Sequence, residues 1–376
     1  MCRYGQLWKG CNALRSSERP RRDYNSKQTA LSRAAWRGWD NITTLLLKRG
    51  AEYNLPDQNQ NTALRLAANN GHEESATSLL TWKIQEDNMD SNDVSTVEIV
   101  LDKIWTDKLR EDWIGQIVCW AARRRNVRVI ELLRAKGFQI NDKLGDMEAR
   151  TALQVIAGEG DLRAVHYLLE IGADPIAAPN DGLTALQAAA QRGQLEVVNR
   201  LLEVGANLNT PAAEDSLTAI QAAAQGGHLE VVNRLLEVGA NLNTPAAENS
   251  LTAIQAAAQG GHLEVVNRLL EVGANFNDTP AAYGGRTALQ AAAQEGHLEV
   301  VNRLLEVGAN PNDTPAAYGG LTALQAAAEG GHQEVITRLL EAGAKADEKA
   351  IEYAEEKGRQ YIVSRLREAR ALAQST

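Results

Sequence analysis

The stretch LTAIQAAAQGGHLEVVNRLLEVGAN occupies residues 217–241, and the same 25 letters return at residues 251–275. Near-copies precede and follow it at a spacing of 33 to 35 residues. The threonine of each T-A-L/I-Q marks the period: Thr151, Thr184, Thr218, Thr252, Thr287 and Thr322. Self-similarity at a fixed period of this length indicates a repeat architecture. Positions around an active site differ in their tasks, so verbatim copying favours stacked building blocks over a catalytic domain.

Each copy contains the signals of two short helices. Thr184 suits the N-cap position, and Gln187, three residues later, completes a capping box. Gly193 ends the first helix, and an apolar i, i+3, i+6, i+7 stripe starts at Leu195 in the second. Gly205 then suits a left-handed C-terminal cap. The capping box returns in four further copies: Thr218/Gln221, Thr252/Gln255, Thr287/Gln290 and Thr322/Gln325.

The unit T-A-L-Q-A-A-A-Q-G-G-H-L-E-V-V-N-R-L-L-E-V-G-A-N resembles the ankyrin repeat, whose usual form is T-P-L-H-x-A-A-x-x-G-H-x-x-V-V-x-L-L-L-x-x-G-A-D. The cadence A-A-Y-G-G-R/L-T-A-L-Q is similar to that of tandem arrays in filamentous fungi. The resemblance extends from about Thr29 to Ala369 and implies an all-α ankyrin-repeat solenoid. Here alanine replaces the motif proline and glutamine replaces the motif histidine. The bond that this histidine makes between adjacent repeats must therefore be remade by glutamine or lost.

Drifted copies extend the array in both directions to about ten helix-turn-helix units. Residues 1–28 are predicted to form a disordered tail, and residues 29–115 degenerate repeats. An insert at residues 82–115 has three interpretations: a loop, an added helix within VSTVEIVLDKIWTDKLREDW, or a degenerate repeat. Residues 116–344 form the regular repeats, and residues 345–376 the C-terminal capping repeat and tail.

Composition divides the chain into two parts. Residues 1–150 contain 24 Lys and Arg against 20 Asp and Glu, whereas residues 151–376 contain 15 against 28. All seven tryptophans lie at or before Trp120. Acidic repeats disfavour nucleic acid as the main ligand, and no apolar stretch approaches the ~20 residues of a membrane span. We expect an intracellular protein, cytoplasmic or nuclear, with no membrane partner and no small-molecule substrate.

Residues capable of chemistry do not converge in the sequence. His72, His228, His262, His297 and His332 recur once per repeat at the start of the second helix, and His166 stands alone inside one. A stack spaces such side chains along its length, so we expect structural roles. Phosphate-binding glycine loops and the G-x-S-x-G elbow do not occur. We therefore expect no catalytic residue, no metal and no cofactor.

In ankyrin arrays that bind partners, contacts usually come from the loop tips, the residue before the T-x-L motif and the end of the first helix. Carried over by position, the resemblance points to one set of residues: Trp36, Arg37, Arg123, Arg124, Arg125, Leu183, Arg192, Leu217, Leu251, Tyr283, Arg286, Tyr318 and Leu321. The four leucines would form an apolar row, or each would pack on its neighbour's loop. The tryptophan and arginines at the front would form a binding corner or a solvated face.

These features predict a non-catalytic scaffold or adaptor that binds a partner protein through its concave face. One alternative is an ankyrin-type transcription coregulator or regulatory subunit in the nucleus. Another is a small enzymatic domain hidden in the first 120 residues. Fold alone does not choose among them.

Overall fold

The computed structural model describes residues 29–57, 59, 61–85, 97, 107–144, 150–177, 183–210, 217–243, 251–277, 285–316 and 319–375. The predicted disordered tail at residues 1–28 lies outside these ranges. Contacts between residues divide the chain into two compact units, unit 1 (Met1–Ala152) and unit 2 (Leu153–Thr376). Each is described by itself below.

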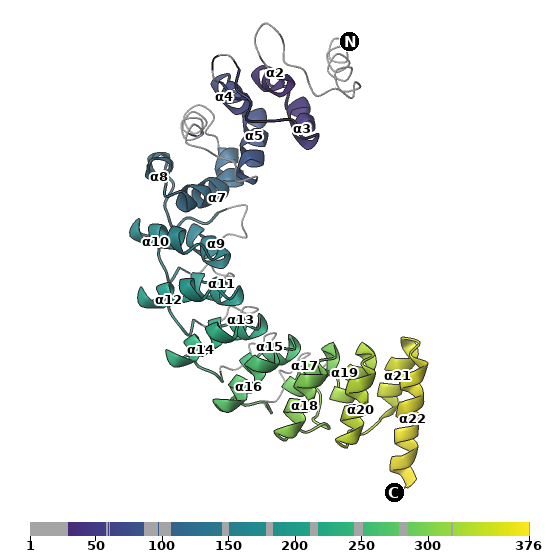
Figure 1. The fold of residues 1–376 in the computed structure, drawn as a ribbon. Coiled ribbons are helices and arrows are strands. Elements are labelled where there is room, and N and C mark those ends of the chain that lie inside the picture. The colour runs from purple at the N-terminus through teal and green to yellow at the C-terminus, as the bar shows by residue number, and fades with distance from the viewer. Residues whose placement is uncertain are drawn as a thin grey trace. The chain divides into compact units, whose positions relative to one another are not determined.

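The described residues form ten pairs of helices and no strand (Figure 1). We call the first helix of each pair the A helix and the second the B helix. The A helices are α2 (Ala30–Arg37), α4 (Ala63–Asn69), α7 (Asp107–Arg123), α9 (Ala152–Glu159), α11 (Ala185–Gln191), α13 (Ala219–Gln225), α15 (Ala253–Gln259), α17 (Ala288–Glu295), α19 (Ala323–Gly330) and α21 (Glu348–Glu356). The B helices are α3 (Asp40–Lys48), α5 (Glu73–Gln85), α8 (Val127–Ala135), α10 (Leu162–Glu170), α12 (Leu195–Glu203), α14 (Leu229–Glu237), α16 (Leu263–Glu271), α18 (Leu298–Glu306), α20 (Gln333–Glu341) and α22 (Gln360–Ser375).

The predicted capping boxes are present. The Thr184 hydroxyl accepts the amide of Gln187 at 3.2 Å, and the Gln187 side chain accepts the amide of Thr184 at 2.7 Å. The same reciprocal pair starts α13, α15, α17 and α19. Gly205 has the expected positive φ of 84°, and its amide donates to Leu202. Because the backbone groups at their ends are hydrogen-bonded, helices of only seven to nine residues are stable within the stack.

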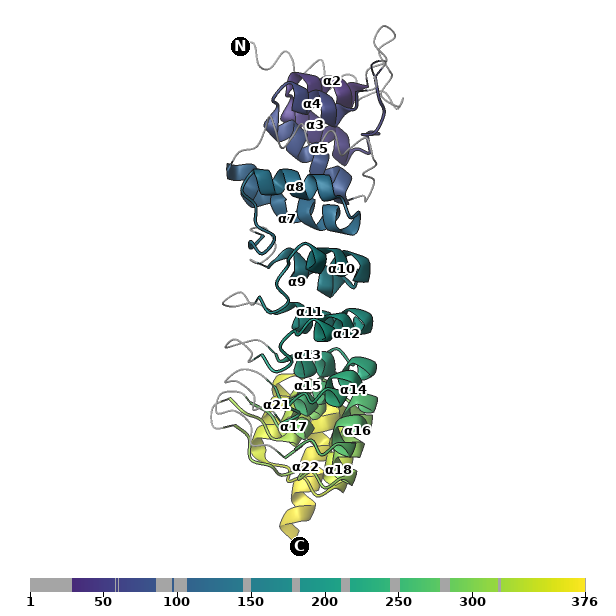
Figure 2. The ribbon, with the colours of Figure 1, turned by 90° about the vertical axis from the view of Figure 1, so that its left-hand side faces the viewer.

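In unit 2 the helices form two layers, with A helices packed on A helices and B helices on B helices; the layers separate clearly in Figure 1, and Figure 2 shows the same stack after a 90° turn. In each central A helix, the residues from the capping threonine to the last alanine of the Ala-Ala-Ala run are buried. In α13 this covers Ala219 through Ala224. Each central B helix adds two valines and a leucine, such as Val231, Val232 and Leu235, to the same core. Neither helix of a pair is long enough to bury its apolar face alone, so neighbouring pairs complete the core.

In unit 1, α2 packs on α4 and α3 on α5, as in the regular repeats, while α5 also contacts α7. Helix α7 starts at Asp107 and runs without interruption into QIVCWAAR, the first helix of the third repeat. The described end of the predicted insert is thus an extension of a repeat helix. Residues 86–96 and 98–106 lie outside the described ranges.

Candidate functional site

In seven of the ten pairs, the side chain that starts the B helix reaches back to the preceding pair; Asn126 and Asp161, which start α8 and α10, cap their own helices instead. His262 Nε2 lies 2.9 Å from the carbonyl oxygen of Gln225, which can only accept, so this nitrogen carries the proton. The other four histidines of this position bond the carbonyls of Trp36, Gln191, Gln259 and Gln294 at 2.9 to 3.0 Å. We call these side chains lids. The expected structural role of the five histidines is confirmed.

A glycine lies beneath each lid. Gly227 has φ 73°, and a Cβ there would collide with the His262 ring. Glycine is therefore required twice, by the left-handed backbone and by the ring above it. Gln194 covers Gly160 and Arg359 covers Gly331 in the same way. Each of the six junctions between pairs in unit 2 carries a lid, whereas in unit 1 His72 covers Gly38 and nothing lies within 4 Å of a Cβ at Gly71.

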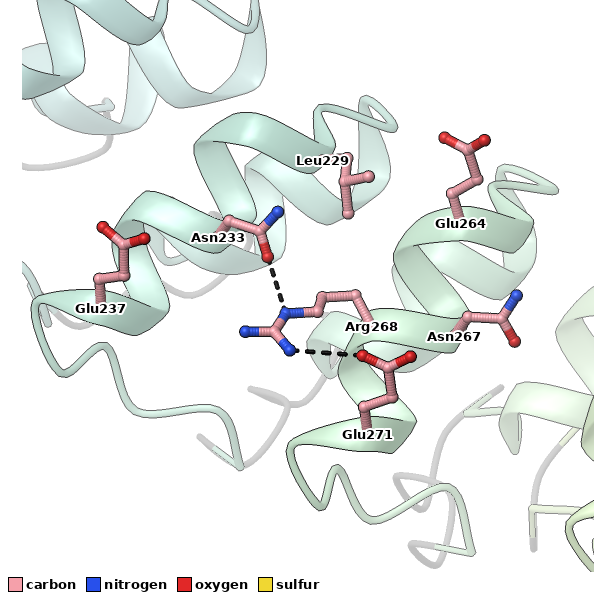
Figure 3. A pocket seen from close by; sticks show the side chains of 7 residues that line it. All are labelled: Leu229, Asn233, Glu237, Glu264, Asn267, Arg268 and Glu271. Atoms are coloured by element: carbon pink, nitrogen blue, oxygen red, sulfur yellow. Dashed lines mark hydrogen bonds and ion pairs between the residues drawn. The ribbon is translucent and has the colours of Figure 1, made fainter.

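Successive B helices are joined by an arginine–asparagine hydrogen bond. Arg268 Nε donates to Asn233 Oδ1 at 2.7 Å, and its Nη1 lies 3.3 Å from Glu271 Oε2 (Figure 3). The bond recurs between the next helices in both directions: Arg234–Asn199, Arg303–Asn267 and Arg338–Asn302, at 2.7 to 2.8 Å. These arginines and asparagines are half-buried and join one repeat to the next.

Between α14 and α16 lies an open hollow of about 540 Å³. Its lining residues are Leu229, Asn233, Glu237, Glu264, Asn267, Arg268 and Glu271 (Figure 3). Arg268 crosses it and is held by Asn233 and Glu271. Within the described ranges, no three His, Cys, Asp or Glu side chains are placed to hold a metal ion.

The glutamine that replaces the motif histidine restores a bond between repeats. Gln290 Oε1 accepts the amide of Thr287 in the capping box, and its Nε2 donates to the carbonyl of Asp313 at 3.4 Å. Gln154 donates to the carbonyl of Ala177 at 2.9 Å, and Gln325 to Asp347 at 2.6 Å. One side chain thus caps its own helix and anchors the loop before the following pair.

The regular A helices are buried along most of their length. Their C-terminal ends are exposed or half-buried, and the described residues directly before the capping threonines are half-buried or lie at the surface. Arg192, at the end of α11, is exposed. Leu183, Leu217, Leu251 and Leu321 are half-buried, as is Arg286 at the equivalent position of the α17 repeat. The leucines are neither freely exposed nor core, so their predicted binding role stays a prediction. Tyr283 and Tyr318 lie outside the described residues.

In unit 1 the predicted front residues lie at the turns between A and B helices. Trp36 is 41% exposed, and the Arg37 guanidinium lies 4.8 Å from the centre of its ring. Arg123, Arg124 and Arg125 are exposed at the end of α7. The two groups belong to the first and third helix pairs, with Asn69 and Asn70 at the turn of the second.

The profile for ankyrin repeats (3 copies) matches residues 1–93, 118–212, 176–246, 219–315 and 255–350. The chain belongs to the ankyrin-repeat family, whose fold is a protein–protein interaction module. The crystal structure of the human ASB11 ankyrin repeat domain is similar, with a TM-score of 0.50 and 27% identity over 60% of this chain and 97% of that one. The predicted all-α ankyrin solenoid is confirmed.

Two curated relatives match shorter segments. The ankyrin repeat and KH domain-containing protein mask-1 of Caenorhabditis elegans is 29% identical over 41% of this chain. The E3 ubiquitin-protein ligase MIB2 of Gallus gallus is 35% identical over 21% of it. The matched segments span only 6% and 8% of those proteins. No helix in the described part of this chain is long and apolar enough to cross a membrane.

Proposed function

We propose that the chain is a non-catalytic adaptor that holds a partner protein along one edge of unit 2. We call this edge the rim: the residues before the capping threonines (Leu183, Leu217, Leu251, Arg286 and Leu321) together with the A-helix end at Arg192. The observation that supports the rim most is its regularity. Each of these leucines precedes a threonine fixed by a two-way capping box, so the stack presents them at one repeating position.

A rigid surface favours binding because few side chains or loops lose conformational freedom when the partner binds. A row of half-buried leucines supplies apolar contact, while Arg192 and Arg286 supply directional hydrogen bonds. Apolar centres with polar neighbours are typical of interfaces between proteins that associate reversibly.

Changing Leu217 and Leu251 together to glutamate tests this role. We expect loss of proteins captured by the tagged full chain, with a modest fall in stability because both side chains are half-buried. The matched control is Leu236→Glu with Leu270→Glu, which changes two half-buried leucines on the B helices. Equal loss from both double variants would show that capture depends on general integrity and not on the rim.

Catalysis is outside this proposal, and the nuclear coregulator remains the alternative. Localisation of a tagged chain distinguishes the two roles. Exclusion from the nucleus would argue against a coregulator and would be compatible with the adaptor role.

A further inference from the structure

The B helices of unit 2 present a face on which exposed apolar side chains alternate with acidic ones. Val238 and Val272 directly follow α14 and α16 at equivalent positions, and they are 36% and 37% exposed. Apolar side chains exposed at a repeating position form the kind of patch that marks interaction sites. Among the described helices, α14 packs on α12, α13 and α16, which cover its other sides.

The charges on this face are mostly negative. Each of α12, α14, α16, α18 and α20 carries two exposed glutamates and one half-buried arginine. The glutamates are Glu196, Glu203, Glu230, Glu237, Glu264, Glu271, Glu299, Glu306, Glu334 and Glu341. Together with Leu229, Val238 and Val272, we call these glutamates the B face.

The hollow between α14 and α16 shows the charge balance at one junction. Three glutamates line it (Glu237, Glu264 and Glu271) against one arginine, Arg268, so three negative charges and one positive charge give −2. Arg268 already pairs with Glu271. Glu264 makes no hydrogen bond or ion pair within the described part of the chain, and its carboxylate points away from Arg268 (Figure 3). The hollow therefore attracts a cation, and half-buried Leu229 gives the methylene groups of a lysine an apolar contact.

The same side chains recur at the neighbouring junctions. Helices α12, α14, α16 and α18 have the identical sequence LEVVNRLLE. Packed helices lie about 8–10 Å apart, so equivalent glutamates should follow one another at about this distance. In an extended or polyproline II chain, three residues span about 9–10 Å. A cation at every third residue of such a chain therefore meets one junction after another.

We propose that the B face binds an extended, basic segment of a partner protein, with a lysine or arginine at every third residue. Its cations contact the glutamates at successive junctions, and apolar residues between them contact Val238 and Val272. The proposal goes beyond the rim, because the B face belongs to the other layer of helices.

A protein segment fits this face better than other charged ligands. A polyamine matches the glutamates but has no apolar side chains for the two exposed valines. A nucleic acid is disfavoured because its phosphates carry the same sign of charge as the ten glutamates.

The test uses the full chain and three fluorescein-labelled peptides of 15 residues. The first repeats Lys-Pro-Val five times, with proline to keep it extended. The second has the same composition with its lysines in one block, and the third has glutamine in place of each lysine. We expect fluorescence anisotropy to show that the first binds at least about threefold more tightly than the second and about tenfold more tightly than the third. Its binding should weaken as salt is raised, because salt screens exposed charges.

The informative variant is Glu230→Gln with Glu264→Gln and Glu299→Gln. These glutamates lie in the first turns of α14, α16 and α18, and within the described ranges they form no ion pair. Their loss therefore leaves the arginine contacts between and within the B helices in place. An exposed ion pair contributes about a two- to threefold gain in affinity, so the triple variant should bind the first peptide about tenfold more weakly.

The matched control is Glu295→Gln with Glu352→Gln and Glu356→Gln. It removes the same number of exposed charges, but from the A helices α17 and α21. It should change binding less than about twofold if the effect is local and not a matter of net charge. Circular dichroism should show that both triple variants are folded.

Equal loss of binding from the two triple variants, or equal binding of the first two peptides, would overturn the proposal. Displacement of the first peptide by spermine at an equal concentration of charge would also overturn it, in favour of a polyamine site. The Leu217→Glu, Leu251→Glu variant should bind the first peptide at least as tightly as the parent, and the Glu230, Glu264 and Glu299 variant should keep the proteins captured by the rim. Failure of the rim and failure of the B face therefore give different results.

Discussion

Unit 1 and unit 2 are built from the same kind of helix pair, but different contacts join successive pairs in the two units. Unit 2 repeats the same contacts at successive junctions: a lid over the glycine that precedes the B helix of the earlier pair and, from α12 to α20, an arginine–asparagine bond between B helices. Unit 1 has one lid, at His72, together with hydroxyl contacts such as Thr43 to Ser75. Regular contacts suit a rigid support, whereas the irregular unit carries arginine and tryptophan at its turns. The comparison therefore shows that the junctions of unit 2 are stabilised by a recurring set of contacts, whereas those of unit 1 differ from pair to pair.

The largest expected effect lies in the core of unit 2. Leu235→Ala removes a fully buried leucine between α14 and its neighbours and should lower the free energy of unfolding by about 2–5 kcal/mol. Urea denaturation followed by circular dichroism measures the change. Leu236→Ala, on the half-buried neighbouring position, is the control and should cost clearly less. Equal losses would mean that the two layers are not packed as described.

Two glycines at the same turn position, Gly71 without a lid and Gly227 under one, form a matched pair between the two units. Gly71→Ala places a Cβ at φ 70° in open space and should cost about 1 kcal/mol, the cost of left-handed backbone. Gly227→Ala adds a collision with the His262 ring and should cost at least about twice as much. The same denaturation curves measure both. If both variants lose the same stability, the lids do not press on the glycines.

Arg125→Gly should act in the opposite direction. Replacing arginine at φ 50° with glycine relieves left-handed strain and should stabilise unit 1 by about 1 kcal/mol. Because all seven tryptophans lie at or before Trp120, tryptophan fluorescence reports the unfolding of unit 1 during heating. The control is Arg49→Gly, at φ −95°, which should destabilise. A fall in stability for Arg125→Gly would mean that the arginine supports the turn.

The smallest effect is expected where the arginine–asparagine series ends. His166 occupies in α10 the position that asparagine occupies in α12, α14, α16 and α18. Among the described residues, the buried Nε of Arg200 has no hydrogen-bond partner. His166→Asn should supply one and stabilise unit 2 by about 0.5–1.5 kcal/mol, the usual worth of such a bond. With Arg200→Lys added, which removes that nitrogen, the gain should disappear.

Local sequence was enough to predict the helix pair, because its signals act within a few residues. The capping box at Thr184 and Gln187 and the glycine at Gly205 are decided by neighbours three or four positions away. Whether the rim can bind a partner depends on how exposed its leucines are. The position of Leu217 directly before a threonine does not predict its exposure, and the structure shows that it is half-buried.

Contacts between repeats were harder to predict. Arg268 and Asn233 are 35 residues apart, and whether they meet depends on the offset between stacked helices. The lone left-handed arginine could have been found from the sequence, however, by aligning Arg125 with the glycines of the other pairs. The sequence predicted a structural role for the histidines, but the carbonyl that each one bonds lies 36 to 38 residues away and depends on how the pairs stack.

The claim that regular contacts make unit 2 the rigid part of the chain is tested most directly by amide hydrogen exchange read by mass spectrometry. Amides of α13, α15 and α17 should exchange slowly and at closely similar rates, because identical junctions open together. Amides of α2, α4 and the end of α7 should exchange faster. Protection in unit 1 equal to or greater than that of α13, α15 and α17 would contradict the account.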